Sequence, residues 1–278
     1  MPRSNASQTR FYVISVITLV SSATVLAITL PPARASMIAA AKSQASELVG
    51  EAAGANAAEA AVDYQIASWL DPTNKAAYLG TARIQIAAGN PETAFKALDH
   101  AGQGSEASSL RIRTLIELGR TNEAADHAAS LTAPEHTDAD IILAAQAYAL
   151  AGRPSDIPAL TALVSTPQAA GRIARAQAGN VPLAGELYTS GLPESSRALL
   201  VKQPNSFERN LLLGRLYYDQ HTTTSLSTAT DYLSSAVKLN PSSAEAHQLL
   251  AAVYAERKMP SESATETILA KKITSGRP

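Results

Sequence analysis

The sequence contains the same break between two helices at two distant places. Residues 70–79 read LDPTNKAAYL and residues 239–249 read LNPSSAEAHQL, and each follows one apolar, helix-like stretch and opens another. Leu-Asx-Pro ends a helix, because proline restricts the residue before it and cannot continue the helix. Between these two places, similar two-helix segments return at intervals of about 34 residues. Such a period predicts a stacked helical array, in which each unit buries its apolar face against its neighbours.

Glycine marks the turn inside these units, and proline often follows it. Glycine adopts the left-handed conformation that ends a helix, and proline fits the first turn of the next one. A second mark is Leu213-Gly214 with Tyr217, which recurs as Leu250-Ala251 with Tyr254. We expect the small residue of each pair to let two helices approach closely. The turn positions are Gly54, Gly89, Gly119, Gly152 and Gly179, with Pro91, Pro154 and Pro182 after three of them.

These positions resemble the tetratricopeptide repeat (TPR) family. Its pattern asks for an early aromatic residue, Leu-Gly or Leu-Ala, a second aromatic residue, then Ala, a large residue, Ala and a closing Pro. Ala60, Tyr64, Ala67 and Pro72 match the later part. The resemblance implies an all-α, right-handed superhelical solenoid of six to seven helix-turn-helix units. The best units are 41–74, 75–104, 207–243 and 244–277, and the weaker ones are 105–137, 138–164 and 165–192. The alternative is an irregular Ala-rich helical bundle.

The array is expected to cover residues 41–277, with possible sub-blocks 41–192 and 205–277. Residues 193–206 contain two prolines and are predicted to be the junction between these blocks. In the weakest unit, Arg172 and Arg175 stand where small and aromatic residues are expected. Residues 219–225 carry an insertion that ends in three Thr and one Ser, and it predicts a lengthened turn because these residues extend helices poorly.

Residues 11–30 (FYVISVITLVSSATVLAITL) contain no charged side chain. About 20 such residues cross the core of a bilayer as a helix. Arg3 and Arg10 precede the segment, so the positive-inside rule keeps residues 1–10 in the cytoplasm and places the repeat domain outside it. The sequence therefore predicts a transmembrane signal-anchor, followed by a linker at residues 31–40.

A cleavable signal peptide is the competing interpretation of the same segment. Ala33-Arg34-Ala35 satisfies the A-x-A rule for cleavage before Ser36. The length of the apolar run favours the anchor, whereas its many Ser and Thr residues and the Pro31-Pro32 pair favour cleavage. In both interpretations the repeat domain is exported.

Composition narrows the classes of function. The chain has no cysteine, which excludes thiol chemistry, disulfides and cysteine-ligated metals. Lys and Arg number 23 against 24 Asp and Glu, and this balance argues against nucleic acid, which requires a basic surface. None of the five histidines lies three or four residues from another, so a helical zinc site is not expected.

No pattern of catalytic residues stands out either. His247 takes a position where the repeat expects an aromatic residue, so we assign it to the core, and Trp69 and Phe95 are predicted to be buried in their second helices. No Glu is marked by its sequence neighbours as a candidate acid or base. The sequence therefore predicts a chain that is not an enzyme and has no cofactor, metal or catalytic residue.

The resemblance implies that first helices line a concave groove. Carried over from the family pattern, two equivalent positions per unit would face this groove. A row of arginines there would bind carboxylates or an acidic peptide by charge-assisted hydrogen bonds. In the alternative interpretation, these arginines face solvent beside acidic neighbours such as Glu117. The candidates at the first position are Arg83, Arg113, Gln146 and Arg215, and those at the second are Ile86 and Tyr218.

Together these features predict a non-enzymatic scaffold or adaptor for protein–protein interaction in a bacterial cell envelope. It is expected to bind a peptide or a partner domain in the concave face. One alternative is a soluble periplasmic or secreted binding protein released after Ala35, and another is an envelope enzyme on a helical scaffold. Self-association is a further possibility, through the apolar Ile268 and Leu269 of the last unit.

Overall fold

The computed structural model describes residues 31–52, 57–132 and 136–276, and these residues contain helices and turns but no strand. They form two compact units that divide after Gly102. The expected boundary at residues 193–206 falls inside the second unit. The predicted membrane segment 11–30, the cytoplasmic residues 1–10 and the Gly54 turn lie outside the described residues. None of the helices in the described ranges combines the length and apolar character needed to cross a membrane.

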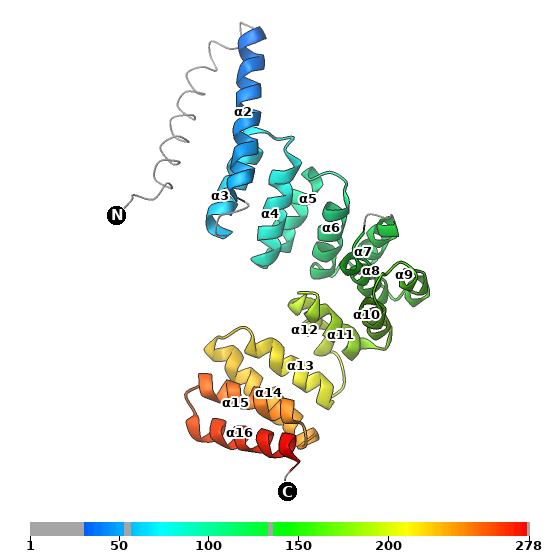
Figure 1. Cartoon of the computed structure of the whole chain (residues 1–278), viewed down its shortest axis with the longest axis vertical. Coiled ribbons are helices and arrows are strands. Elements are labelled where there is room, and N and C mark those ends of the chain that lie inside the picture. Colours follow the sequence, from blue (N-terminus) through cyan, green and yellow to red (C-terminus); the bar gives the residue numbers. More distant parts are fainter. Residues whose placement is uncertain (1–30, 53–56, 133–135, 277–278) are drawn as a thin grey trace, which may run out of the picture. The chain divides into compact units, whose positions relative to one another are not determined.

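The first unit consists of two helix pairs, α2 with α3 and α4 with α5 (Figure 1). Its core joins Ala45 and Leu48 of the first helix to Tyr64 and Ala67 of the second and to Ala77 of the third. Residues 31–40, predicted to be a linker, are instead the first part of α2. The helices are α2 (Pro31–Ala52), α3 (Ala57–Leu70), α4 (Lys75–Ala87) and α5 (Pro91–His100).

The second unit continues the pairing with α6/α7, α10/α11, α13/α14 and α15/α16 (Figure 1). The unit predicted at 138–164 is degenerate, because only two short helical segments follow its first helix. The described chain is therefore an all-helical series of helix pairs. The helices are α6 (Ser105–Glu117), α7 (Thr121–Ala128), η1 (Ala129–Thr132), α8 (Asp138–Leu150), η2 (Pro154–Asp156), α9 (Pro158–Thr161), α10 (Pro167–Gln177), α11 (Asn180–Thr189), α12 (Pro193–Leu200), α13 (Phe207–Tyr218), α14 (Thr223–Leu239), α15 (Ala244–Glu256) and α16 (Pro260–Ser275).

The glycine turns share one geometry. Gly89, Gly119 and Gly152 have φ of 73°, 71° and 69°. After each glycine, the next backbone N–H donates to the carbonyl five residues back, as in Asn90 N to Gln85 O at 2.8 Å. This hydrogen bond closes the last turn of the first helix in a Schellman motif. The left-handed conformation is confirmed for these three glycines. The prediction is wrong for Gly179, which has φ of 133° and ψ of 176° and is instead the N-cap of α11.

Two turns of the second unit adopt this conformation without glycine. His221 has φ of 51° and Lys258 has φ of 59°. Met259 N donates to Tyr254 O at 2.9 Å, so the turn at Lys258 keeps the same hydrogen bond as the glycine turns. A side chain in the left-handed region crowds the carbonyl oxygen that follows it.

Replacing Lys258 with glycine is expected to stabilise the protein by about 1 kcal/mol, since it relieves this crowding. Lys258 is exposed, so little packing is lost. Chemical denaturation followed by circular dichroism measures the change. Lys96→Gly in the middle of α5, at an exposed position, is the matched control, and it should destabilise the protein by about 1 kcal/mol through poor helix propensity. A destabilised Lys258→Gly variant would contradict the prediction.

Close approach of helices occurs at Gly214 and Gly80, each of which follows a leucine inside a first helix. A Cβ atom on Gly214 of α13 would lie 2.5 Å from Cγ of Leu233, which is fully buried in α14. A Cβ on Gly80 of α4 would lie 2.3 Å from the ring of Tyr64 in α3. Only a hydrogen atom fits at either place, which confirms the interpretation of the small residue at Gly214.

Three predictions about local structure are wrong. Thr222 does not extend the turn. It begins α14 as its N-cap, with Thr222 and Ser225 forming a reciprocal capping box. The hydroxyl groups that disfavour a helix interior satisfy the free N–H groups at a helix start. Trp69 is also not buried, because 59% of its surface is exposed near the end of α3, and Phe95 is only half-buried. Residues 193–200, expected within a junction, form α12, which starts at Pro193.

Candidate functional site

The six candidate groove residues divide between the two units. Arg83 is exposed and Ile86 half-buried, and both lie on α4 of the first unit. In the second unit, Arg113 lies on α6, Gln146 on α8, and Arg215 and Tyr218 on α13. Five of them are on first helices of their pairs, as the repeat register predicts, and Gln146 is on the first helix of the degenerate unit. Their exposure differs, and this decides which of them a ligand can reach.

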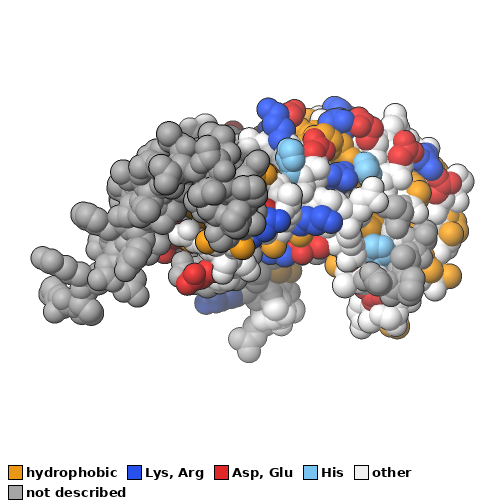
Figure 2. All heavy atoms as spheres, turned by 90° about the horizontal axis from the view of Figure 1, so that it is seen from above, with side chains coloured by type: hydrophobic (Ala, Val, Ile, Leu, Met, Phe, Trp, Pro, Cys, Tyr) orange, Lys and Arg blue, Asp and Glu red, His pale blue; other side chains and the backbone are white. Residues whose placement is uncertain are grey.

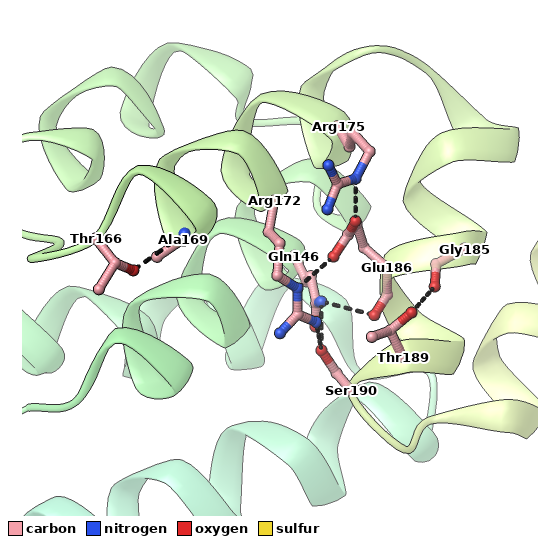
Figure 3. Close-up of polar contacts among 9 residues, drawn as sticks. All are labelled: Gln146, Thr166, Ala169, Arg172, Arg175, Gly185, Glu186, Thr189 and Ser190. Atoms are coloured by element: carbon pink, nitrogen blue, oxygen red, sulfur yellow. Dashed lines mark hydrogen bonds and ion pairs between the residues drawn. The ribbon is translucent and has the colours of Figure 1, made fainter.

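Gln146 does not line a groove, because its side chain has no exposed surface. Its Nε2 donates to the carbonyl oxygen of Glu186 at 3.1 Å and to Oγ of Ser190 at 2.7 Å. Figure 3 shows it inside a polar cluster formed by α8, α10 and α11. Its Oε1 is buried without a hydrogen-bond partner among the described residues.

Arg113 reaches the same turn from another helix. Its guanidinium donates to the carbonyl oxygens of Ser190 and Gly191, each at 2.6 Å. These carbonyls lie at the C-terminal end of α11, where the helix dipole favours a cation. The carbonyl oxygens of the turn after α11 thus accept the hydrogen bonds that Arg113 was expected to donate to a ligand. The repeat register brought Arg113 and Gln146 to one place, but a segment of the same chain occupies it.

A buried carboxylate lies beside this turn. Glu186 of α11 is 4% exposed and forms ion pairs with two arginines of α10 (Figure 3). Nε of Arg172 is 2.7 Å from Oε2 of Glu186, and Nε of Arg175 is 2.5 Å from Oε1. Arg172 also donates to Oγ of Ser190 at 2.9 Å. Both carboxylate oxygens are therefore satisfied, as a buried charge requires.

The ion pairs explain why the weakest unit departs from the repeat pattern. Arg172 and Arg175 lie one turn apart on the same face of α10, which places both beside one residue of the next helix. Sequence reasoning missed Glu186. The available signal was the pair of arginines at positions where the pattern asks for small and aromatic residues, because such a pair requires a carboxylate in the helix that packs against it.

Glu117 is a second acidic residue in unusual surroundings. It lies at the end of α6, half-buried, and Oγ of Ser195 is 3.3 Å from its Oε2. Burial raises the pKa of Glu117, although the hydrogen bond from Ser195 lowers it. The charge of Glu194 raises it further, and Arg113 opposes this.

The Glu117→Gln variant is expected to be more stable than the wild type at pH 7. A raised pKa means that the folded state disfavours the ionised form, so folding is penalised above the folded-state pKa and not below the usual value of 4.5. The gain in thermal midpoint should therefore be largest at neutral pH and disappear near pH 4. A scan of thermal unfolding against pH for both proteins measures it. An equal midpoint difference at both pH values would contradict the assignment.

Arg215 and Tyr218 face the next helix pair. Arg215 pairs with Glu245 at the start of α15. At the end of the same helix, Glu256 accepts from His221 at 2.9 Å, and this contact raises the pKa of His221. Tyr218 lies edge-on to His221, with ring centroids 5.2 Å apart. Helix α15 therefore has an acidic residue near each end, and each of them contacts a basic residue of the preceding pair, α13/α14.

Other polar groups are structural. His247 is buried, as predicted, and its ring nitrogens contact Glu266 at 2.5 Å and the Pro241 carbonyl oxygen at 3.0 Å. Within the described ranges, no group of three or more His, Asp or Glu side chains is placed to hold a metal ion. On the face shown in Figure 2, basic and acidic side chains are interspersed.

No protein-family model matches this chain, and no curated protein matches it significantly. Several solved structures are similar over most of its length. "MamA MSR-1 C2" is 12% identical over 73% of this chain and 98% of that one, with a TM-score of 0.28. Yeast Tom70 is 18% identical over 84% and 50%, with 0.36, and the Naa15/Naa10 structure with HypK-THB is 15% identical over 80% and 38%, with 0.32. These similarities are too loose to define the fold or the function of this chain.

Proposed function

We propose that this chain is a non-enzymatic scaffold or adaptor that binds a peptide or partner domain through its first helices. The observation that carries the proposal is the series of helix pairs, several of which are joined by the same kind of turn. In such a series each first helix repeats the same side-chain positions, so a row of residues forms without any catalytic geometry. Extended rows of this kind suit protein ligands.

The exposure of the arginines indicates where a ligand would bind. Arg113 is hydrogen-bonded to the turn after α11, and Gln146 is buried. Arg83 is exposed, and 34% of the Arg215 side chain is accessible beside Glu245. Exposed ion pairs contribute little to stability, so a carboxylate of a ligand can replace Glu245 at low cost. An acidic segment is therefore the ligand that we propose for these two positions.

The proposed location is the outer side of a bacterial cytoplasmic membrane, with residues 11–30 as the anchor. The support is the uncharged run of 20 residues after two arginines. Recovery of the chain from the soluble fraction with Ser36 as its first residue would replace this proposal with a released binding protein.

Site-specific photo-crosslinking in cells tests the function. A photoreactive amino acid replaces Arg83 or Arg215 on first helices, and Glu92 or Asp231, which are exposed on second helices, in the matched controls. We expect a partner to be crosslinked from each first-helix position, and weakly or not at all from the second-helix control of the same unit. Equal crosslinking from all four positions, or none from any, would overturn the proposal.

A further inference from the structure

The last helix pair has an open trough between α15 and α16. It contains a hollow of about 300 Å³ lined mostly by small residues, among them Ala251, Ala255, Ser263 and Ala270. The hollow continues toward Lys258 and Pro260 at the turn between the helices. Lys271 lines it near the other end. Figure 1 shows the two helices side by side at the C-terminal end of the described chain.

The preceding pair shows what such a trough holds. Helix α15 packs against both α13 and α14, with Leu250 and Val253 in one core with Leu226 and Leu233 of α14. The acidic residues at its two ends meet bases on that pair. Glu245 contacts Arg215, and Glu256 contacts His221. The trough of α13/α14 is thus filled by an amphipathic helix with a carboxylate near each end.

The two troughs correspond position by position, 37 residues apart. Leu211, Tyr218, Leu226 and Leu233 belong to the core that includes the buried side of α15. Their counterparts Gln248, Ala255, Ser263 and Ala270 line the open trough. Residue 258 likewise corresponds to residue 221, and both have positive φ and a basic side chain.

The differences between the troughs define the missing helix. At three of these four positions a small residue replaces Leu or Tyr, so the occupant of the open trough needs larger side chains than those of α15 to fill it. Of the residues that line it, the charged ones are Lys258 and Lys271, and both are exposed. Neither forms an ion pair within residues 31–52, 57–132 and 136–276. Ile268 lies one helical turn before Lys271 on α16. It is 65% exposed and adds an apolar side chain next to the trough.

We propose that the α15/α16 trough binds an amphipathic α-helix of a partner protein, with bulky apolar residues on one face and Asp or Glu near each end. From Pro260 to Lys271 the trough is about 16 Å long, which fits about three helical turns. Helix-in-groove recognition of this kind depends on apolar anchors at helical spacing. The proposal specifies one partner of the scaffold function, and it uses a surface separate from Arg83 and Arg215.

The probe is a fluorescent peptide with the sequence of residues 243–257, held helical by a side-chain crosslink outside its apolar face, with phenylalanine at the positions of Leu250 and Val253. Fluorescence anisotropy measures its binding to the full chain in detergent. We expect saturable binding that weakens at least tenfold in the double variant Lys258→Glu/Lys271→Glu. Lys272→Glu is the matched control, because it makes the same change on the same helix outside the trough, and it should alter affinity less than twofold.

One further variant and one further peptide complete the test. Ala255→Trp, at an exposed position, should abolish binding by filling the hollow while circular dichroism stays unchanged. A peptide with Gln in place of both acidic residues should bind at least tenfold more weakly to the wild type and equally to the double variant. Equal binding by the double variant and Lys272→Glu, or no binding of the acidic peptide, would overturn the proposal. Dimerisation lost in Ala255→Trp would also overturn it in favour of a second copy. The crosslinking from Arg83 and Arg215 is unaffected by these outcomes.

Discussion

Replacing Gly214 with alanine is expected to lower the free energy of unfolding by about 2 kcal/mol. The added Cβ would lie 2.5 Å from Cγ of Leu233, which is the branch point of a fully buried side chain and cannot move aside as a chain end does. Overpacking of a filled core costs about 1–3 kcal/mol, which outweighs the gain in helix propensity from glycine to alanine. Urea denaturation followed by circular dichroism measures the change.

Gly185→Ala is the matched control in the same unit. Gly185 lies inside α11, and a Cβ there would meet its nearest neighbour, Cδ2 of Leu212, at an ordinary 3.9 Å. The same substitution should therefore stabilise the protein by about 1 kcal/mol through helix propensity alone. The opposite signs separate close packing from propensity. If both variants were stabilised, α13 and α14 would not approach as closely as described.

The sequence predicted those parts of the fold that depend on local conformation. The glycine turns at Gly89, Gly119 and Gly152 could be found because each has a left-handed residue where one helix ends and the next begins, and glycine adopts that conformation without strain. His221 and Lys258 were missed as turn residues of this kind because nothing in their side chains favours that conformation. The N-cap role of Thr222 was missed for another reason. The same residue types disfavour helix interiors and favour helix starts, so composition alone did not place the boundary.

The sequence predicted which repeat positions the candidate site residues take. It did not predict that another segment of the chain contacts some of them. Repeat spacing placed Arg113 and Gln146 at equivalent positions, and the structure brings both to one turn. The contacts of Arg113 with Ser190 and Gly191 join residues 77 and 78 positions apart. Such long-range packing of α11 against earlier helices is not encoded in a 34-residue period. Trp69 shows the same limit, because its exposure depends on which neighbours cover α3.

The Glu186→Leu variant is expected to lose about 3 kcal/mol of stability. Removing one partner of a buried ion pair leaves its opposite charge uncompensated, at a cost of about 3–5 kcal/mol. We expect the lower end of this range, because Arg175 is 58% exposed and can turn to water, whereas Arg172 is only 25% exposed. Thermal and urea unfolding measure the loss. Glu245→Gln removes an exposed acidic partner of Arg215 and should cost less than about 0.5 kcal/mol.

A second substitution shows whether charge or shape causes the loss. In Glu186→Leu/Arg172→Met the stranded cation is also replaced by an apolar side chain, and apolar replacement of a buried ion pair is often neutral or stabilising. The double variant should therefore be more stable than Glu186→Leu alone, with a coupling energy of about 1–3 kcal/mol. Additive losses would mean that the two residues act through packing. In that case Arg172 and Arg175 would depart from the repeat pattern for a reason other than Glu186.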